Sequence, residues 1–190
     1  MSLISPLRRW WLNGLPHRFH LARQVLSFLR ACPEPFRGQV LEVGAGSGLT
    51  SRQILETFPQ VELTAIDIDD AATDMFDSLK EKYGRRLKVE RGNVLRLHFD
   101  RNSFDFVIVI NVMSSLQLYG VKAALRELLR VTRPGGLIGV SEHLLMTRPG
   151  VSSREVVQQV LMREDCDVLY VKGRRRYDMW IRKPYPVEPV

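Results

Sequence analysis

The stretch VLEVGAGSG, at residues 40–48, decides the fold of this 190-residue chain. Its first four residues complete a short apolar strand over 39–43, and glycine then occupies every second position. Glycine lets the backbone turn sharply and come close to a ligand, and a helix predicted over 49–58 would point its free amides at that ligand. The sequence therefore predicts a strand, a ligand-binding loop and a helix in direct succession.

Strands and helices alternate on either side of this loop. The predicted strands are 39–43, 61–68, 87–90, 104–110, 137–140, 168–171 and 177–181, and the predicted helices cover about 19–29, 49–58, 69–83, 121–129 and 152–161. Alternation predicts a mainly parallel sheet with helices on both faces. A tight turn at Gly173 joins the last two strands, so one of them must be antiparallel. The predicted fold class is α/β, with a doubly wound, seven-stranded sheet.

Length and composition favour a single domain over residues 1–190, because 45% of the residues are hydrophobic and 26% are charged. Cys32 and Cys166 are isolated, and with four scattered histidines they give no metal-ligand spacing, so no metal is expected. The start of the sequence does not resemble a secretory signal, and no run of about 18 apolar residues is found. We therefore expect a cytoplasmic protein.

The net charge of +7 is concentrated at the start of the chain, because residues 1–30 hold five arginines and no acidic residue. Within this segment, Arg8-Arg9-Trp10-Trp11 combines cations with amphipathic aromatic rings. Such a combination suits contact with a membrane surface, binding to nucleic acid, or a lid over the ligand site, and all three stay open. Residues 1–35 are interpreted as an N-terminal arm and helix that cover this site.

An acid at the end of the second strand indicates the kind of ligand. Asp67 lies 67 − 48 = 19 residues after Gly48, which suits a carboxylate bonded to the ribose hydroxyls of an adenosine. A dinucleotide loop would need its third glycine where Leu49 stands, and the carboxylate of Glu42 would repel a pyrophosphate. The same carboxylate would attract S-adenosylmethionine, whose sulfonium and ammonium outweigh its one carboxylate. The pattern therefore favours S-adenosylmethionine over NAD.

Four motifs in order resemble the class I S-adenosylmethionine-dependent methyltransferases, and in particular the type 11 and type 25 methyltransferase domains. The first two are VLEVGAGSG and the AIDID run at 65–69. The third is Gly92-Asn93-Val94, where the family usually has Gly-Asp-Ala, ahead of SFDFVI at 103–108; the fourth is LRVTRPGG at 129–136. The resemblance covers about residues 36–145. It implies a Rossmann-like fold, with S-adenosylmethionine as cofactor and S-adenosylhomocysteine as product.

The resemblance also implies a role for each matching position. The positions implied to bind the cofactor are Glu42, Gly44, Ala45, Gly46, Gly48, Asp67, Ile68, Asn93, Val94 and Asn111. The glycine loop and Glu42 would line the methionine portion, and Asp67 would hold the ribose. Ile68 would pack on the adenine face, Asn93 and Val94 would bond its ring, and Asn111 would lie near the sulfonium. An ordinary turn at Asn93 is the alternative there.

Methyl transfer from a sulfonium needs no protonation of the leaving group, so the enzyme contributes chiefly position and a water-poor pocket. The candidate general base is His143, which follows Glu142 at the end of the fifth strand. A purely structural role for this histidine is the alternative. His17, His20 and His98 are weaker candidates, the last of them expected in a surface loop.

Short loops at 111–120 and 142–151 predict an open site, which suits a small-molecule or lipid-like acceptor. The expected function is methyl transfer from S-adenosylmethionine to such an acceptor. RNA methylation is an alternative because the ends of the chain are basic. A non-catalytic cofactor-binding scaffold is another, because no catalytic signature is found. The acceptor atom and the oligomeric state are left open.

Overall fold

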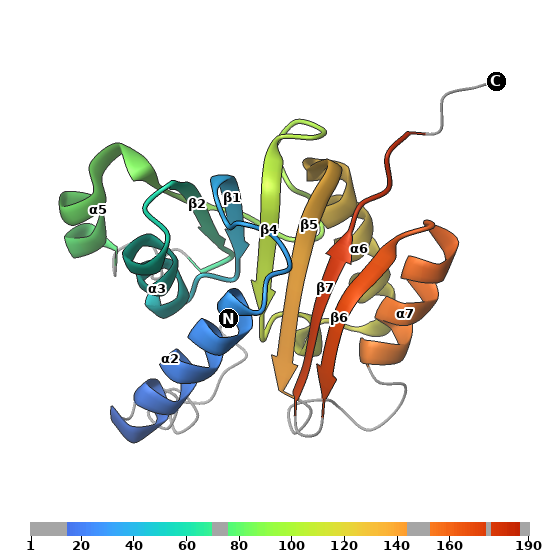
Figure 1. The fold of residues 1–190 in the computed structure, drawn as a ribbon, viewed down its shortest axis with the longest axis horizontal. Helices are drawn as coiled ribbons and strands as arrows, with labels where there is room; N and C mark the ends of the chain where they lie inside the picture. Colours follow the sequence, from blue (N-terminus) through green and yellow to red (C-terminus); the bar gives the residue numbers. More distant parts are fainter. Residues whose placement is uncertain (1–14, 70–75, 144–152, 174–175, 187–190) are drawn as a thin grey trace.

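The computed structural model describes residues 15–69, 76–143, 153–173 and 176–186, and its centre is a seven-stranded sheet (Figure 1). Its strands are β1 (Gly38–Val43), β2 (Val61–Asp67), β3 (Leu87–Arg91), β4 (Phe104–Ile110), β5 (Thr132–His143), β6 (Asp167–Gly173) and β7 (Arg176–Arg182). They lie in the order β3-β2-β1-β4-β5-β7-β6. β7 runs antiparallel to both neighbours, and the pairings among β1 to β5 are parallel. The predicted fold class is confirmed.

Helices cover both faces of the sheet. They are α2 (Leu15–Arg30), α3 (Leu49–Thr57), α5 (Asp77–Tyr83), α6 (Leu118–Val131) and α7 (Ser153–Arg163), with two short 3-10 turns, η1 (Gly84–Arg86) and η2 (Met113–Ser115). In Figure 1, α6 and α7 lie on one face, and α2 and α3 lie on the other. None of these described helices is both long and apolar enough to span a membrane.

The apolar run of β4 explains why both faces are covered. β4 reads FDFVIVI, and successive side chains of a strand point to opposite faces. Val107 and Val109 belong to the core under α6 and α7, whereas Phe106 and Ile108 belong to the core under α2 and α3. A strand that is apolar on both faces is stable only between two layers of helices, and β4 therefore lies at the centre of the sheet.

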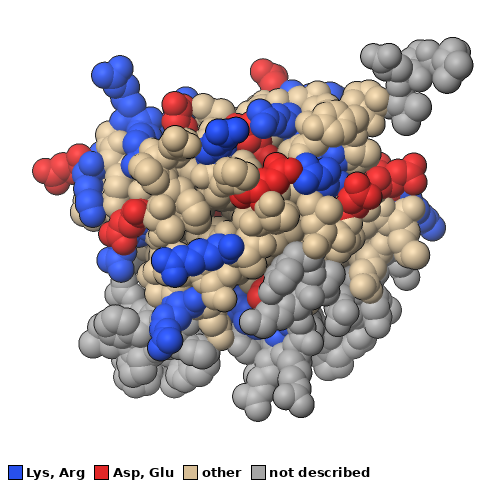
Figure 2. Space-filling view, viewed as in Figure 1, with Lys and Arg blue, Asp and Glu red and all other residues tan. Residues whose placement is uncertain are grey.

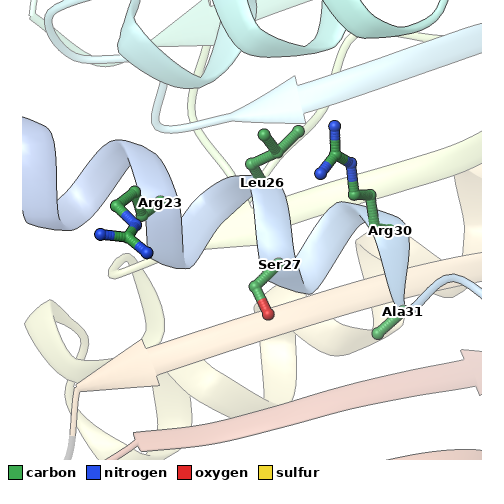
Figure 3. A pocket seen from close by; sticks show the side chains of 5 residues that line it. All are labelled: Arg23, Leu26, Ser27, Arg30 and Ala31. Atoms are coloured by element: carbon green, nitrogen blue, oxygen red, sulfur yellow. The ribbon is translucent and has the colours of Figure 1, made fainter.

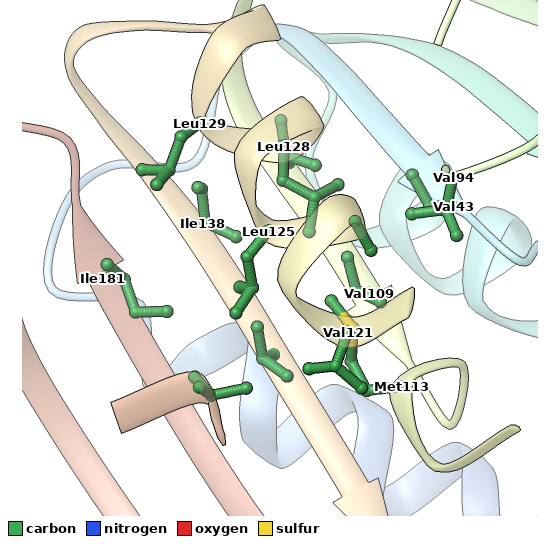
Figure 4. Packing of buried hydrophobic residues seen from close by; sticks show 14 of the residues in the cluster. Val43, Val94, Val109, Met113, Val121, Leu125, Leu128, Leu129, Ile138 and Ile181 are labelled. Atoms are coloured by element: carbon green, nitrogen blue, oxygen red, sulfur yellow. The ribbon is translucent and has the colours of Figure 1, made fainter. Parts of the chain in front are cut away.

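Helix α6 closes the first of these cores with an apolar stripe. Val121, Leu125 and Leu128 recur at helical spacing and are buried. Figure 4 shows them pointing from α6 toward the strands, where Val109 and Ile138 are labelled. The helix predicted over 121–129 is confirmed, although α6 extends further at both ends.

The sequence Pro134-Gly135-Gly136 has the composition of a turn that would precede the predicted strand 137–140, but it forms a bulge within β5. Thr132 pairs with Phe104 and Leu137 pairs with Phe106, so residues 133–136 stand opposite a single residue of β4. Gly135 has φ +74, and its amide donates to the carbonyl of Lys183 at 2.9 Å. β5 therefore begins at residue 132 and not at residue 137, because partners in β4 and after β7 hold this segment against the sheet.

Other predicted boundaries also shift. The second strand ends at Asp67, one residue earlier than predicted. Of the helix predicted over 69–83, the described part is α5, which begins at Asp77, and residues 70–75 lie outside the described residues. Helix α2 begins at Leu15, and residues 1–14 of the predicted N-terminal arm also lie outside the described residues.

Candidate cofactor site

The segments singled out from the sequence meet where parallel strands end. Residues 44–48 follow β1, residues 92–94 follow β3 and residues 111–115 follow β4, while residues 67–69 begin with the last residue of β2. Because these four strands are neighbours and run in the same direction, the four segments lie along one side of the sheet, here called the carboxyl edge. Ligands of open parallel sheets bind at this edge, near the point where the strand order reverses.

The glycine loop, residues 44–48, is held by backbone bonds and leaves no space for side chains at its start. The amides of Gly44 and Ala45 both donate to the carbonyl of Ile66, at 2.8 and 3.0 Å. Gly44 has φ +78, and a Cβ atom built on it would lie 2.2 Å from Cγ2 of Val112. Gly48 precedes α3 with φ +71 and no side-chain cap, so the first amides of α3 can bind a ligand.

Asp67 joins β2 to the glycine loop. One of its carboxylate oxygens accepts a hydrogen bond from the Gly46 amide at 2.8 Å, and the other accepts one from the Asp69 amide at 3.0 Å. A carboxylate has about four acceptor positions, so these two bonds leave room for ribose hydroxyls. The next residue, Ile68, exposes 62% of its surface, which gives the edge an apolar surface beside the carboxylate.

Glu42 is an acid buried beneath the glycine loop. Its exposed fraction is 3%, and the hydroxyl of Ser51, from the first turns of α3, donates a hydrogen bond to its carboxylate. Burial raises the pKa of Glu42 to about 8; the bond from Ser51 opposes this rise, and the negative charge of Asp67 adds to it. Near neutral pH, Glu42 is therefore an acid that a positive ligand would help to ionise.

Glu142, at the end of β5, is fully buried and bonds the segment after β4. One of its oxygens accepts hydrogen bonds from the amides of Val112 and Met113, at 2.7 and 2.8 Å. The other oxygen accepts one from the Ser114 amide at 3.2 Å. Burial raises the pKa of Glu142, although these amide bonds act in the opposite direction. Among the described residues, these amides are partners of Glu142; its pairing with His143 stays a prediction, because the His143 side chain lies outside the described residues.

The two asparagines predicted to bind cofactor lie at the carboxyl edge. Asn111 has φ +57, an unusual value for a residue other than glycine, and its amide donates to the carbonyl of Ser141 at 2.9 Å. Asn93 is exposed, and its side-chain oxygen accepts a hydrogen bond from the Leu95 amide at 2.9 Å. A ligand would share this oxygen with the turn that Asn93 forms. The neighbouring Val94 is buried, with 7% exposed.

The histidines divide into two groups. His98 lies in a surface loop, as predicted, with half of its side chain exposed and Nε2 2.7 Å from a carboxylate oxygen of Glu90. His143 is the last residue of β5, opposite Arg176 of β7, and its side chain lies outside the described part of the structure. The same holds for the side chains of His17 and His20 in α2. Their catalytic roles stay predictions.

A shallow hollow on α2 is separate from the carboxyl edge. It measures about 420 Å³ and is lined by Arg23, Leu26, Ser27, Arg30 and Ala31 (Figure 3). All five residues belong to one helix or directly follow it, so they form a single wall and do not enclose a ligand. Within the described ranges, no group of three or more His, Cys, Asp or Glu side chains is placed to hold a metal ion.

Some residues of the site carry no local signal in the sequence. Ser51 bonds Glu42 across nine positions, and Glu142 bonds amides about thirty positions earlier. Val112, two residues after β4, contacts Gly44 of the glycine loop across a separation of 112 − 44 = 68 positions. A buried acid in an apolar strand predicts that some donor must be present, which is the one signal that could have indicated Ser51.

Similarity to known proteins agrees with this geometry. The profile of the methyltransferase domain family matches residues 40–136. The chain is 31% identical over 109 residues to sterol 24-C-methyltransferase ERG6B of Gibberella zeae, covering 56% of this chain and 28% of that protein. It is 42% identical over 82 residues to ribosomal RNA small subunit methyltransferase H of Nostoc sp., covering 43% of this chain and 27% of that protein.

A solved structure extends the likeness to the whole fold. An S-adenosylmethionine-dependent methyltransferase from Aquifex aeolicus superimposes with a TM-score of 0.69 and 20% identity, over 95% of this chain and 99% of that one. This chain belongs to the class I S-adenosylmethionine-dependent methyltransferases, a family of enzymes whose cofactor is S-adenosylmethionine. The chain spans little more than a quarter of the length of the two curated relatives named above.

Proposed function

We propose that this protein transfers the methyl group of S-adenosylmethionine to a small-molecule or lipid-like acceptor. The observation that carries the proposal is the carboxyl edge, where the glycine loop bonds the carboxylate of Asp67 and exposed Ile68 follows directly. The similarity to a sterol methyltransferase supports the lipid-like class of acceptor. The chain matches only part of that relative, so the acceptor is inferred from chemistry and likeness together.

The residues of the carboxyl edge fit this cofactor. The absence of a Cβ at Gly44 keeps the loop close to Val112, and the uncapped amides of α3 suit the carboxylate of the methionine portion. Glu42 suits its positive charge. The free acceptor positions of Asp67 suit the ribose hydroxyls. The apolar side chain of Ile68 suits the face of the adenine ring, and Asn93 and Val94 would bond its edge.

The chain's own contribution to the reaction is mainly position. Bound S-adenosylmethionine supplies an electrophilic methyl group on a sulfonium. Asn111 is fixed at the end of β4 by the bond from its amide to Ser141, and it borders the methionine end of the site. Holding an acceptor in line at this place supplies much of the rate enhancement. His143 would remove a proton if the attacking atom of the acceptor carries one.

The N-terminal segment belongs to the same proposal. Helix α2 packs beside α3, which begins at the glycine loop, and Phe28 stacks on Trp180 of β7 with ring centroids 4.9 Å apart. This docking places α2 in the layer of helices beside the glycine loop, and it supports the interpretation of residues 1–35 as a cover of the site within a single domain. A membrane surface would then be contacted through the basic part of this segment.

The acceptor class is tested by following the methyl group. Purified protein is incubated with S-adenosylmethionine carrying a radioactive methyl group and with a cellular lipid extract, an aqueous metabolite extract or total RNA. We expect the label in the lipid or metabolite fraction. Asp67→Ala should abolish labelling, and Asp77→Ala, at an acid that is 82% exposed on α5, should preserve it. No label in either fraction would falsify the proposed acceptor class.

RNA is the second candidate acceptor, favoured by the likeness to a ribosomal RNA methyltransferase. In Figure 2, basic side chains gather on the lower left of the face, where Figure 1 has α2, whereas acidic and basic side chains are mixed in the upper half. Arg23 and Arg30 border the shallow hollow on that helix. Label confined to RNA, with binding that weakens steeply as salt rises, would favour this candidate.

A further inference from the structure

Glu142 is the carboxylate that organises the segment after β4. It accepts hydrogen bonds from three successive backbone amides, those of Val112, Met113 and Ser114, at 2.7, 2.8 and 3.2 Å. Its side chain is fully buried, and Met113 beside it is buried as well. These amides open the 3-10 turn η2, whose N-cap residue, Val112, makes no side-chain cap of its own. Without the carboxylate, amides in this buried position would lose their partners.

The segment that Glu142 holds is also the one that contacts the glycine loop. Cγ2 of Val112 occupies the space where a Cβ atom on Gly44 would lie, at 2.2 Å from that position. Immediately before it, Asn111 takes a left-handed backbone conformation and bonds Ser141, the neighbour of Glu142 in β5. A path of direct contacts therefore runs from Glu142 through Val112 to Gly44.

We propose that Glu142 is the positioning residue for the methionine end of the cofactor site. It fixes Val112 against Gly44, and this contact sets where the glycine loop and Asn111 stand relative to each other. The inference rests on the proposed function, because it takes these residues as the surroundings of the methionine portion. Asp67 and Ile68, at the end of β2, belong to the adenosine end, which Glu142 does not contact.

The number of acceptors explains why a glutamate suits this place. A carboxylate accepts at both oxygens, and here one oxygen serves two amides while the other serves a third. Glutamine has the same shape, but only one of its two terminal atoms is an acceptor. Glu142→Gln would keep the bonds to Val112 and Met113 and would turn an amide N–H toward the Ser114 N–H. Glu142→Ala would remove all three bonds.

The test compares two ligands that differ only at the methionine end. S-adenosylhomocysteine carries the amino-acid portion, and 5′-methylthioadenosine lacks it. Calorimetric titration of both ligands into Glu142→Gln should show about tenfold weaker binding of S-adenosylhomocysteine. Binding of 5′-methylthioadenosine should change less than about twofold, because its contacts lie at a separate place. Glu142→Ala should widen the difference between the two ligands, so that Glu142→Gln retains part of the affinity for S-adenosylhomocysteine that Glu142→Ala loses.

Two control variants separate positioning from general stability and from the cofactor site itself. Asp105→Asn alters a carboxylate of the same kind, mostly buried and bonded to the Gln39 amide, at the opposite end of the same strands. It should leave the affinities of both ligands unchanged, even where thermal unfolding shows a loss of stability. Asp67→Ala should weaken both ligands together, because it removes the ribose contact that they share.

The outcomes are distinct. A Glu142→Gln variant that weakens both ligands equally, or neither, while Asp67→Ala weakens both, would overturn the role of Glu142 and leave the proposed cofactor site standing. Wild-type protein that binds neither ligand would overturn both proposals. If Asp67→Ala changes nothing, the ribose assignment is wrong, and the two-ligand difference for Glu142 still decides the positioning role.

Discussion

Buried carboxylates at the two ends of the parallel strands have different kinds of partners. At the amino end, Asp105 of β4 accepts a hydrogen bond from the Gln39 amide at 2.6 Å and pairs with the guanidinium of Arg133. At the carboxyl edge, Glu42 and Glu142 are buried with hydroxyl or amide donors, and no ion pair with a described cation is found for either. The amino end is thus neutralised by its own residues.

This difference indicates which end awaits a ligand. An unpaired buried carboxylate is costly to ionise, and burial accordingly raises the pKa of Glu42 to about 8. A ligand with a sulfonium and an ammonium would supply the missing positive charge. The amino end, where Asp105 is neutralised by Arg133, gains nothing from such a ligand. The cofactor would therefore complete the electrostatics of one end of the sheet and leave the other unchanged.

The largest contrast between the two ends should come from glycine substitutions. In Gly44→Ala the new Cβ atom would lie 2.2 Å from Cγ2 of Val112, at a residue whose φ is +78. We expect the free energy of unfolding to fall by about 2–4 kcal/mol and cofactor binding to be lost. Gly84, before β3, has φ +51 but no atom within 4 Å of such a Cβ. With ψ −124 this conformation also favours glycine, so Gly84→Ala should lower the free energy of unfolding by about 1–3 kcal/mol and leave binding intact.

Urea unfolding and titration with S-adenosylhomocysteine measure these two effects. Equal losses of stability and of binding in the two alanine variants would show that the contact between Gly44 and Val112 is not a constraint on the site.

A smaller effect is expected in the pH dependence of stability. The pKa of Glu42 rises from its ordinary value of 4.5 to about 8 on folding. Between these values the folded protein keeps a proton that the unfolded chain has lost, so unfolding releases a proton and stability falls as pH rises. Glu42→Gln should remove this decline between about pH 5 and pH 8, whereas Asp105→Asn should retain it.

Urea unfolding at a series of pH values is the measurement. A decline of the same steepness in Glu42→Gln would mean that another group carries the proton. Binding offers a second check. The sulfur of S-adenosylhomocysteine is uncharged, so the preference for S-adenosylmethionine over this ligand should grow as pH rises toward 8 and Glu42 ionises.

The smallest effect concerns the donor that Glu42 already has. Ser51→Ala removes the hydroxyl that bonds this carboxylate, which should raise the pKa of Glu42 further. At pH values above that pKa, the free energy of unfolding should fall by about 1 kcal/mol. The decline of stability should then extend to higher pH than in the wild type. Ser103→Ala, which removes a hydroxyl bond to the Asp100 carbonyl near the amino end, is the matched control and should not move the decline.

Much of the fold was predictable because its signals are local. The run FDFVIVI predicts a strand covered on both faces, and the structure places β4 between two helical layers. The glycine loop and Asp67 are predicted at the ends of successive strands, and in the structure the Gly46 amide bonds the Asp67 carboxylate. Such features depend on residues close in sequence or on the order of the strands.

The other features of the site and sheet were not predictable, because they depend on contacts with backbone groups of residues far away in the sequence. The residue type at those positions does not reveal such contacts. Glu142 bonds backbone amides about thirty residues earlier, and any residue type at those positions would offer the same amides. Likewise, Pro134-Gly135-Gly136 has the composition of a turn, but the Gly135 amide is held by the carbonyl of Lys183. The roles of the cofactor-binding residues and of His143 remain predictions.

The stacking of Phe28 on Trp180 has a consequence for the folding of this protein during its synthesis on the ribosome. Helix α2 is made early, but the ring on which it rests emerges 180 − 28 = 152 residues later, as does Arg176, which bonds Gln24. At about 5–20 residues per second, the helix waits roughly 8 to 30 seconds for its place. β7 is complete 182 − 143 = 39 residues after β5 ends, so for roughly 2 to 8 seconds the edge of β5 that pairs with β7 is open to wrong pairing.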